Sequence, residues 1–326
     1  MSAYTPHDVA AVCALGVTLG ATLLAGFCLS WLRWTNLARA GAWALVSVAV
    51  AAAAGLCAHQ PPGIRMLGVI AVLLTAMKAV VVVEARAVNG LRLTLWQWLA
   101  FATWPGMQPA AFATSGKGPL PGARELLRCG VIRLVSGVAL IGVSRLVWLG
   151  TASRTCATIA LLPGLSLVVH FGLFNIGAGL WRRCGVECDA LFRAPLAARS
   201  LGEFWARRWN LAFSEMTAMA VYRPLLRRVG RAPATVAAFL FSGVLHELAI
   251  SLPVRRGYGL PLAYFVVQGG LVLIERALQA RGRAIAATRW AARVWVLGWL
   301  ALPLPLLFHP PFLAGVIWPL IGIPAP

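Results

Sequence analysis

Eight apolar runs, most of them long enough to cross a lipid bilayer, follow one another along this chain of 326 residues. A hydrocarbon core about 30 Å thick requires roughly 20 apolar residues in a helix. Sixty per cent of the residues are hydrophobic and only 12% are charged, which is too apolar for a soluble domain. We therefore predict an all-α polytopic membrane protein. Its expected spans are residues 9–31, 41–57, 66–83, 131–149, 156–180, 234–252, 260–278 and 294–313.

Basic residues are distributed unequally between the two sets of connections. One set carries 22 Lys and Arg residues, ten of them between Arg182 and Arg231, whereas the other set carries five. Because basic loops stay in the cytoplasm, this asymmetry predicts that both termini lie outside. The Ala-, Gly- and Arg-rich composition suggests a bacterial cytoplasmic membrane. The arginines flank apolar segments, so we expect them to bind membrane lipids and not nucleic acid.

The seven cysteines predict neither a disulfide framework nor a metal site. Most lie inside apolar runs, where cysteine behaves as a small hydrophobic residue. Cys184 and Cys188 flank Glu187, but no second pair of ligands has suitable spacing. No basic segment precedes the first apolar run, and this favours an uncleaved span over a signal peptide.

The connection between the third and fourth spans, here the first connection, is rich in aromatic residues. It contains LWQWLAFATWPGMQPAAF, from Leu95 to Phe112, interrupted by Pro105, Gly106 and Pro109. This pattern predicts a helix lying at the membrane interface and then a turn. We expect its tryptophans to act as membrane-surface anchors.

The second connection, from Trp181 to Pro233, predicts a further interfacial helix. Ser200 and Glu203 form a capping-box pattern, and no helix breaker follows before Pro224, so the helix should run unbroken to Tyr222. On a helical wheel its side chains separate into two faces. One face carries Trp205, Trp209, Ala212, Phe213 and Met216, and the other carries Glu203, Arg207, Asn210 and Ser214. The second face could be an ordinary solvated stripe, although a neutral amide such as that of Asn210 contributes little to headgroup binding.

The sixth run, Ala234 to Leu252, carries His246 and Glu247 well inside its apolar sequence. Ionisable residues within a membrane span mark functional sites by default. Ser242 lies four residues before His246 on the same helical face, and Gly243 beside it leaves room for an approaching group. We therefore expect this face to line a cavity. The alternative is a histidine that only packs against neighbouring helices through a hydrogen bond.

Several motifs in this chain resemble the plant-type wax synthase branch of the membrane-bound O-acyltransferase superfamily. FWARRWN (204–210) is followed after about thirty residues by SGVLHE (242–247). PLAARSLGE (195–203) and FATWPGMQP (101–109) also resemble that branch. The chain departs from the plant pattern at Ala206, where glycine is common.

The resemblance implies one membrane-embedded acyltransferase domain over residues 1–326, with a wax synthase-like core at about 96–280. It implies helices surrounding an intramembrane reaction chamber, in which acyl-CoA donates its acyl chain to a long-chain alcohol, a sterol or a similar hydroxyl acceptor. No further cofactor is implied. In the family the corresponding histidine and asparagine are associated with catalysis, which assigns His246 as the general base and Asn210 to the oxyanion or to thioester positioning.

The remaining candidate site residues are those that we expect to contact the substrates. Arginine side chains in the second connection suit the phosphates of CoA, since the guanidinium fork matches them; Arg223, Arg227 and Arg228 belong to this group. The other candidates are Trp205, Arg207, Arg208, Trp209, Ser242 and Glu247, of which Glu247 is expected to pair with a base in the bundle.

Two other functions fit the same features. A transporter or flippase would also place polar residues at mid-membrane, but usually shows paired broken helices in corresponding halves of the chain, and no such internal repeat is visible. A non-catalytic lipid-binding protein would keep the cavity without needing both His246 and Asn210.

Overall fold

A computed structural model describes residues 2–324, apart from residues 115, 117, 284, 285 and 287. The described residues form helices and no strand, so the predicted all-α polytopic fold is confirmed. Eight helical stretches are long and apolar enough to cross a membrane, and each overlaps a predicted span. They are Val9–Trp31 (α1), Thr35–Leu56 (α2), Pro62–Asn89 (α3), Ala123–Thr151 (α6), Arg154–Arg183 (α7 to α8), Arg231–Val254 (α12 to α13), Leu260–Ala280 (α14) and Arg289–Leu307 (α15 to α16).

The last predicted span, 294–313, is wrong at its end. The helical stretch ends at Leu307, and a separate, shorter apolar helix runs over Pro310–Ile321. The imidazole of His309 caps this second helix by accepting a hydrogen bond from the Phe312 N–H. Because Pro310 and Pro311 have no N–H, they cannot continue the preceding helix but fit the first turn of the next one.

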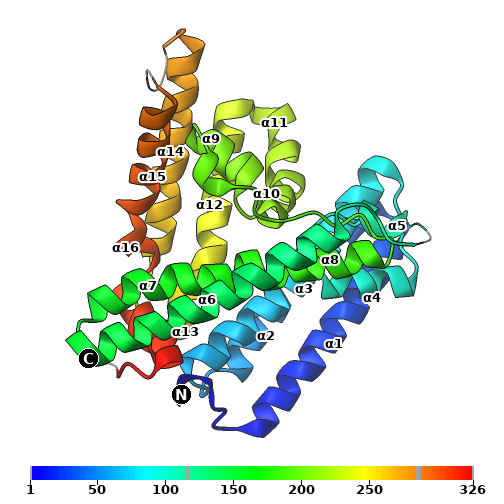
Figure 1. The fold of residues 1–326 in the computed structure, drawn as a ribbon. Helices are drawn as coiled ribbons and strands as arrows, with labels where there is room; N and C mark the ends of the chain where they lie inside the picture. Colours follow the sequence, from blue (N-terminus) through cyan, green and yellow to red (C-terminus); the bar gives the residue numbers. More distant parts are fainter. Residues whose placement is uncertain (1, 115, 117, 284–285, 287, 325–326) are drawn as a thin grey trace.

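Helix α3 lies at the centre of the structure (Figure 1). It packs against α1 and α2, and 67% of its most apolar window is buried, against 11% for α1 and for α6. Helices α6, α7 and α8 cross the view of Figure 1 together, and α12 packs along α14. Segments α9 to α11 of the second connection lie beside the start of α12, with α9 spanning Leu201–Glu203, α10 Leu211–Thr217 and α11 Arg223–Val229.

The first connection folds into the protein more deeply than predicted. The expected helix is present as α4 (Leu95–Thr103), and a capping box between Thr94 and Gln97 begins it. Trp96 is 78% exposed, as a surface anchor should be, but Trp98 and Trp104 are 1% and 4% exposed. The prediction of surface anchors is therefore wrong for these two, which pack in the main hydrophobic cluster.

Lys78 of α3 holds the turn that follows α4. Its ammonium donates to the carbonyls of Trp104 and Gly106 at 2.6 and 3.0 Å, and it lies 3.8 Å from the centre of the Phe101 ring. The side chain is buried. A cation in an apolar span thus positions a backbone turn of the WPGM sequence.

The predicted unbroken helix of the second connection is wrong. The helix that begins at Leu201 ends at Arg208, and α10 begins after Asn210, whose backbone is left-handed at φ 42°. Asn is one of the few residues besides Gly that adopts this conformation readily. Beyond the break, the helix continues past Pro224 to Val229 through a π-helical turn at Ala218–Tyr222.

Only half of the predicted capping box at Ser200 forms. The Ser200 hydroxyl accepts from the Glu203 N–H, but the Glu203 carboxylate accepts from the Arg199 N–H and pairs with Arg208. A second carboxylate supports the same helix start: buried Glu275 of α14 accepts from the N–H groups of Leu201 and Gly202 at 2.8 and 3.0 Å. The second connection is therefore attached to a membrane-spanning helix.

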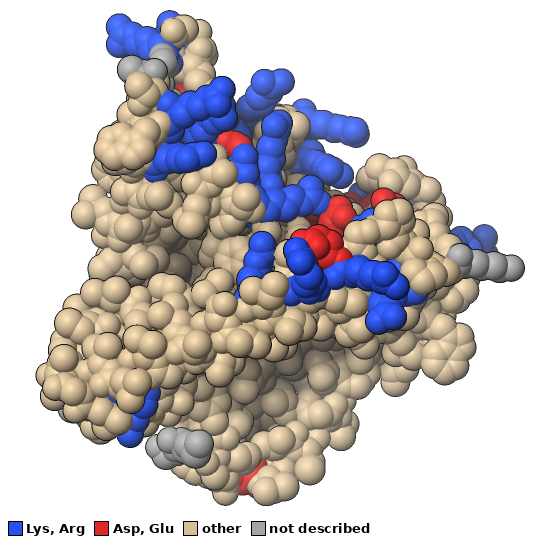
Figure 2. Space-filling model, in the orientation of Figure 1, with Lys and Arg blue, Asp and Glu red and all other residues tan. Residues whose placement is uncertain are grey.

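Basic side chains gather at one end of the molecule. Figure 2 shows Lys and Arg over α9, α11 and the far end of α14, whereas most of the rest of this face carries little charge. The two termini lie together at the opposite end (Figure 1). Which end faces the cytoplasm stays a prediction.

Candidate functional site

A cavity of about 430 Å³ lies between the second connection and the helices α12 and α14. Its volume is in the range of small-molecule sites. The α12 wall is one helical face, formed by Thr235, Ala238, Phe239, Ser242 and His246. Among the predicted site residues, six line the cavity: Trp205, Trp209, Asn210, Arg223, Ser242 and His246.

His246 lies at one end of this cavity between two aromatic rings. Its ring centre is 5.3 Å from that of Phe213 and 4.3 Å from that of Phe265. Nδ1 lies 2.7 Å from the carbonyl oxygen of Ser242. Since a carbonyl can only accept, Nδ1 carries the proton and the Nε2 of the neutral ring keeps its lone pair. No residue that the structure describes donates to Nε2.

Asn210 joins the cavity wall from the break in the second connection. Its Oδ1 accepts from the Phe213 N–H at 3.3 Å and so caps α10. The amide Nδ2 has no partner among the described residues, which leaves two N–H donors for a ligand. The left-handed backbone at this position orients the amide as helix cap and as part of the wall.

Residues 188–267, which contain both side chains, match the sequence signature of the membrane bound O-acyl transferase family. Over this stretch the chain is similar to the membrane-bound O-acyltransferase superfamily. The chain is 29% identical over 136 residues to a long-chain-alcohol O-fatty-acyltransferase of Simmondsia chinensis, a match covering 36% of this chain and 39% of that protein. It is 31% identical over 147 residues to the probable long-chain-alcohol O-fatty-acyltransferase 2 of Arabidopsis thaliana, covering 40% and 43%. The predicted wax synthase-like branch is thereby supported over about two fifths of these relatives' length.

Gly243 in the SGVLHE sequence serves helix packing. A Cβ placed there would lie 2.6 Å from the Leu262 side chain and 3.0 Å from its Cα. The room that the sequence suggested for an approaching group is therefore filled by α14. Ser242 is buried, and its hydroxyl donates to the carbonyl of Ala238 within the helix.

Glu247, the other ionisable residue of the motif, does not line the cavity. Its Oε1 accepts from the N–H groups of Gly259 and Leu262 at 2.9 and 3.0 Å. The expected pairing with a base is wrong, because this carboxylate caps the N-terminus of α14, where negative charge is favourable.

The arginines line the cavity only in part as expected. Arg207 is exposed and Arg208 pairs with Glu203 at 2.7 Å, and neither lines the cavity. Arg223 does line it, as does Arg276 of α14, which the sequence analysis did not select. Arg276 is positioned by a 2.6 Å hydrogen bond to the Thr235 hydroxyl. Only the packing of α12 on α14 brings Arg276 to Thr235 and to the cavity, so the sequence carried no local signal for Arg276.

The Trp205 ring forms part of the cavity wall, and a hydrogen bond from its indole N–H holds it in place. Its indole N–H donates to buried Gln268 at 3.1 Å, and the Gln268 amide donates to the Trp299 carbonyl at 2.7 Å. Trp209 stacks on Phe204 with ring centres 5.5 Å apart. Both rings are therefore rigid surfaces.

His170 is a second intramembrane histidine that the sequence analysis did not consider. Its ring stacks on Phe192 at 4.7 Å and meets Trp209 edge to face at 5.7 Å. Its Nδ1 lies 3.1 Å from the Ser166 hydroxyl. It does not line the cavity, and its contacts are those of a packing residue behind Trp209.

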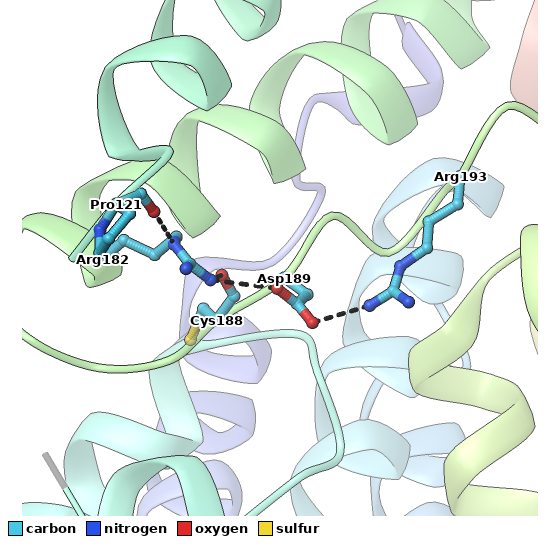
Figure 3. Close-up of polar contacts among 5 residues, drawn as sticks. All are labelled: Pro121, Arg182, Cys188, Asp189 and Arg193. Carbon is cyan, nitrogen blue, oxygen red and sulfur yellow. Dashed lines mark hydrogen bonds and ion pairs between the residues drawn. The ribbon is translucent and has the colours of Figure 1, made fainter.

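The two connections meet along a polar seam beside the cavity. Figure 3 shows Asp189 between Arg182 and Arg193, with N–O distances of 3.1 and 2.7 Å. Arg182 also donates to the carbonyls of Pro121 and Cys188.

Burial raises the pKa of the Cys188 thiol to about 12, so it stays protonated at neutral pH.

Proposed function

We propose that this protein transfers an acyl chain from acyl-CoA to the hydroxyl of a lipophilic alcohol, forming an ester. The single observation that carries the proposal is that His246 and Asn210 line one cavity, while the Nε2 of His246 and the Nδ2 of Asn210 have no partner among the described residues. The names of the plant relatives support long-chain alcohols as the acceptor class. A sterol remains an alternative acceptor.

His246 would act as the general base. Its Nε2 takes the hydroxyl proton while the alcohol oxygen attacks the thioester carbonyl carbon and forms the new C–O bond. Collapse of the tetrahedral intermediate breaks the C–S bond, and the imidazolium returns the proton to the leaving thiolate. The hydrogen bond from Nδ1 to the Ser242 carbonyl supports this role, since it stabilises the imidazolium and fixes the ring.

Asn210 would meet the oxygen that becomes negatively charged. Its Nδ2 is the free end of an amide whose oxygen is held by the α10 N-terminus. The amide could stabilise the oxyanion or position the thioester carbonyl before attack. Both roles need an N–H donor whose position is fixed before the substrate binds. The hydrogen bond by which the Asn210 oxygen caps α10 holds the amide in this way.

The cavity would orient the donor by charge. Arg223 and Arg276 line it, and Arg276 binds Thr235 of α12. His246 lies eleven residues after Thr235 on the same α12 face, roughly 16 Å away along the helix. The CoA phosphates suit the arginine end. The thioester would then lie near His246, with the cytoplasm on the basic side of the membrane and both termini outside.

The test is ester formation by the purified protein. Labelled acyl-CoA is supplied with a panel of long-chain alcohols, sterols and diacylglycerol, and products are identified by mass spectrometry, with heat-inactivated protein as the control. We expect a long-chain ester to form. Absence of ester with every acceptor, together with lipid binding or lipid movement across vesicles, would favour the lipid-binding or transporter alternative.

A further inference from the structure

Glu215 of α10 is a carboxyl group that the proposed mechanism does not use. It lines the cavity and also a small hollow at the seam with the first connection. Gln108 donates to its Oε1. No residue that the structure describes donates to its Oε2, so this oxygen can accept a hydrogen bond from a ligand. Burial raises the pKa of Glu215, although Gln108, Arg193 and Arg223 oppose that shift.

A second polar group in the same stretch of wall also lacks a partner. The Thr217 hydroxyl is buried, lines the cavity and has no hydrogen bond within the described residues. Buried polar groups normally have partners, and an orphan in a cavity wall indicates a group that a ligand satisfies. The stretch between Phe213 and Arg223 is therefore built for a ligand with polar groups of its own.

The position of Glu215 along the cavity follows from a helical hairpin. The continuous helix from α10 to α11 packs against α12, and Gly230 with φ 81° joins the two arms. The Phe213 ring meets His246 across the hairpin. Glu215 lies two residues nearer the joint than Phe213, roughly 3 Å along the axis, and so on the arginine side of His246.

We propose that Oε2 of Glu215 accepts a hydrogen bond from the amide N–H of acyl-CoA that lies nearest the thioester. This inference rests on the proposed function. In CoA two methylene groups separate that amide nitrogen from the sulfur, a short spacing comparable to the roughly 3 Å axial step from Phe213, whose ring meets His246, to Glu215. Glu215 is thus a substrate-positioning residue that places the thioester for attack.

Acyl-CoA is favoured over the alcohol as the partner of Glu215, because acyl-CoA carries polar groups along its arm whereas the alcohol carries one hydroxyl at its end. The arm of CoA must run from Arg223 and Arg276 to His246, and Glu215 lies on that route. The chain of a lipophilic alcohol is apolar, and burying it against an unpaired carboxyl would be unfavourable. Its single hydroxyl must meet His246.

Truncated donors separate this role from the others. Three thioesters of one acyl chain are compared: acyl-CoA, S-acyl-N-acetylcysteamine, which keeps only the nearest amide, and an S-butyl thioester, which has neither amide nor phosphate. In Glu215→Gln the amide oxygen can still bind Gln108, so an N–H group replaces the accepting oxygen in the cavity. We expect kcat/KM to fall about tenfold for the first two donors and to stay unchanged for the S-butyl thioester.

Two further variants make the pattern specific. Arg276→Gln should lower kcat/KM for acyl-CoA and leave the two donors without phosphates unaffected. Glu187→Gln is the matched control, because Glu187 is exposed and borders the small hollow but not the cavity; all three donors should react as in the wild type.

Two outcomes would overturn the role of Glu215. One is an equal loss with all three donors in Glu215→Gln, and the other is a change confined to the KM of the alcohol. Ester formation by the wild-type protein tests the proposed function separately, so a failure of the Glu215 role can be distinguished from a failure of the proposed function.

Discussion

Lys78 in α3 and His246 in α12 are both ionisable residues inside membrane-spanning helices, but their surroundings differ. The Lys78 ammonium is buried against two carbonyls and an aromatic ring. His246 has one ring nitrogen bound to a carbonyl, whereas the other opens into a cavity with no partner among the described residues. The first environment satisfies the group, and the second leaves a proton acceptor free.

The contrast refines the rule that intramembrane ionisable residues mark functional sites. Lys78 and His246 differ in whether a cavity-lining side chain keeps a polar atom that has no hydrogen-bond partner among the described residues. Glu247 differs from His246 as well, since its Oε1 caps α14 and its buried Oε2, which has no partner among the described residues, belongs to a side chain that does not line the cavity. Asn210 belongs with His246. Each of the following substitutions tests one side of this division.

The largest effect is expected for His246→Gln. Glutamine can keep a hydrogen bond to the Ser242 carbonyl but has no lone pair basic enough to take a hydroxyl proton at neutral pH. Ester formation should slow at least about 10²-fold, while acyl-CoA binding persists. Single-turnover rates and binding are measured on one purified sample. If the variant kept most of its activity, His246 would have a structural role, as Lys78 does.

Asn210→Ala should lower kcat about 10²-fold, the scale seen when an oxyanion-hole donor is removed. The cap of α10 is lost as well, at about 1 kcal/mol, so turnover is normalised to folded protein. Asn210→Asp serves as the control, because it keeps the capping oxygen and removes the free N–H donors. If Asp restored turnover, the cap and not the donor would be what matters.

Lys78→Met should mainly affect stability. Removing the ammonium leaves the carbonyls of Trp104 and Gly106 buried without donors, a cost of about 1–3 kcal/mol each. The melting temperature in detergent should fall, whereas kcat per folded molecule stays close to the wild-type value. A large loss of kcat in fully folded protein would assign Lys78 to the reaction instead.

Glu247→Gln should have the smallest effect. The amide oxygen can still accept from the Gly259 and Leu262 N–H groups, and only the favourable charge at the α14 N-terminus is lost, about 0.3–1 kcal/mol. Turnover and the KM for both substrates should match the wild type. A turnover defect approaching that of His246→Gln would show that the two neighbouring residues act together.

The spans were predictable because length and hydropathy alone decide them, and these need no knowledge of neighbours. The face of α12 followed from helical spacing around His246. The break at Asn210 was not predictable, because asparagine also occurs within helices and nothing local indicated its left-handed backbone. A helical wheel drawn through Trp209 therefore assigned faces to a helix that does not exist.

The part of the site that could not be predicted depends on tertiary contacts between residues far apart in the sequence. Arg276 and Thr235 are 41 residues apart in sequence and meet only because α12 packs along α14. Glu215 is bound by Gln108, 107 residues away on the other connection, and only the folded chain brings the two together. Burial of Trp98 and Trp104 likewise depends on α4 folding back onto the bundle.

The anchoring of Lys78 has a consequence for how the protein is assembled in the membrane. A lysine near the centre of a span costs about 2.5–3.5 kcal/mol during insertion. The carbonyls that satisfy it lie 26 and 28 residues later in the chain, so a ribosome synthesises α3 before either of them. Helix α3 is therefore synthesised before its ammonium can be satisfied, and the Lys78 side chain gains its partners only when the WPGM turn folds back onto the helix.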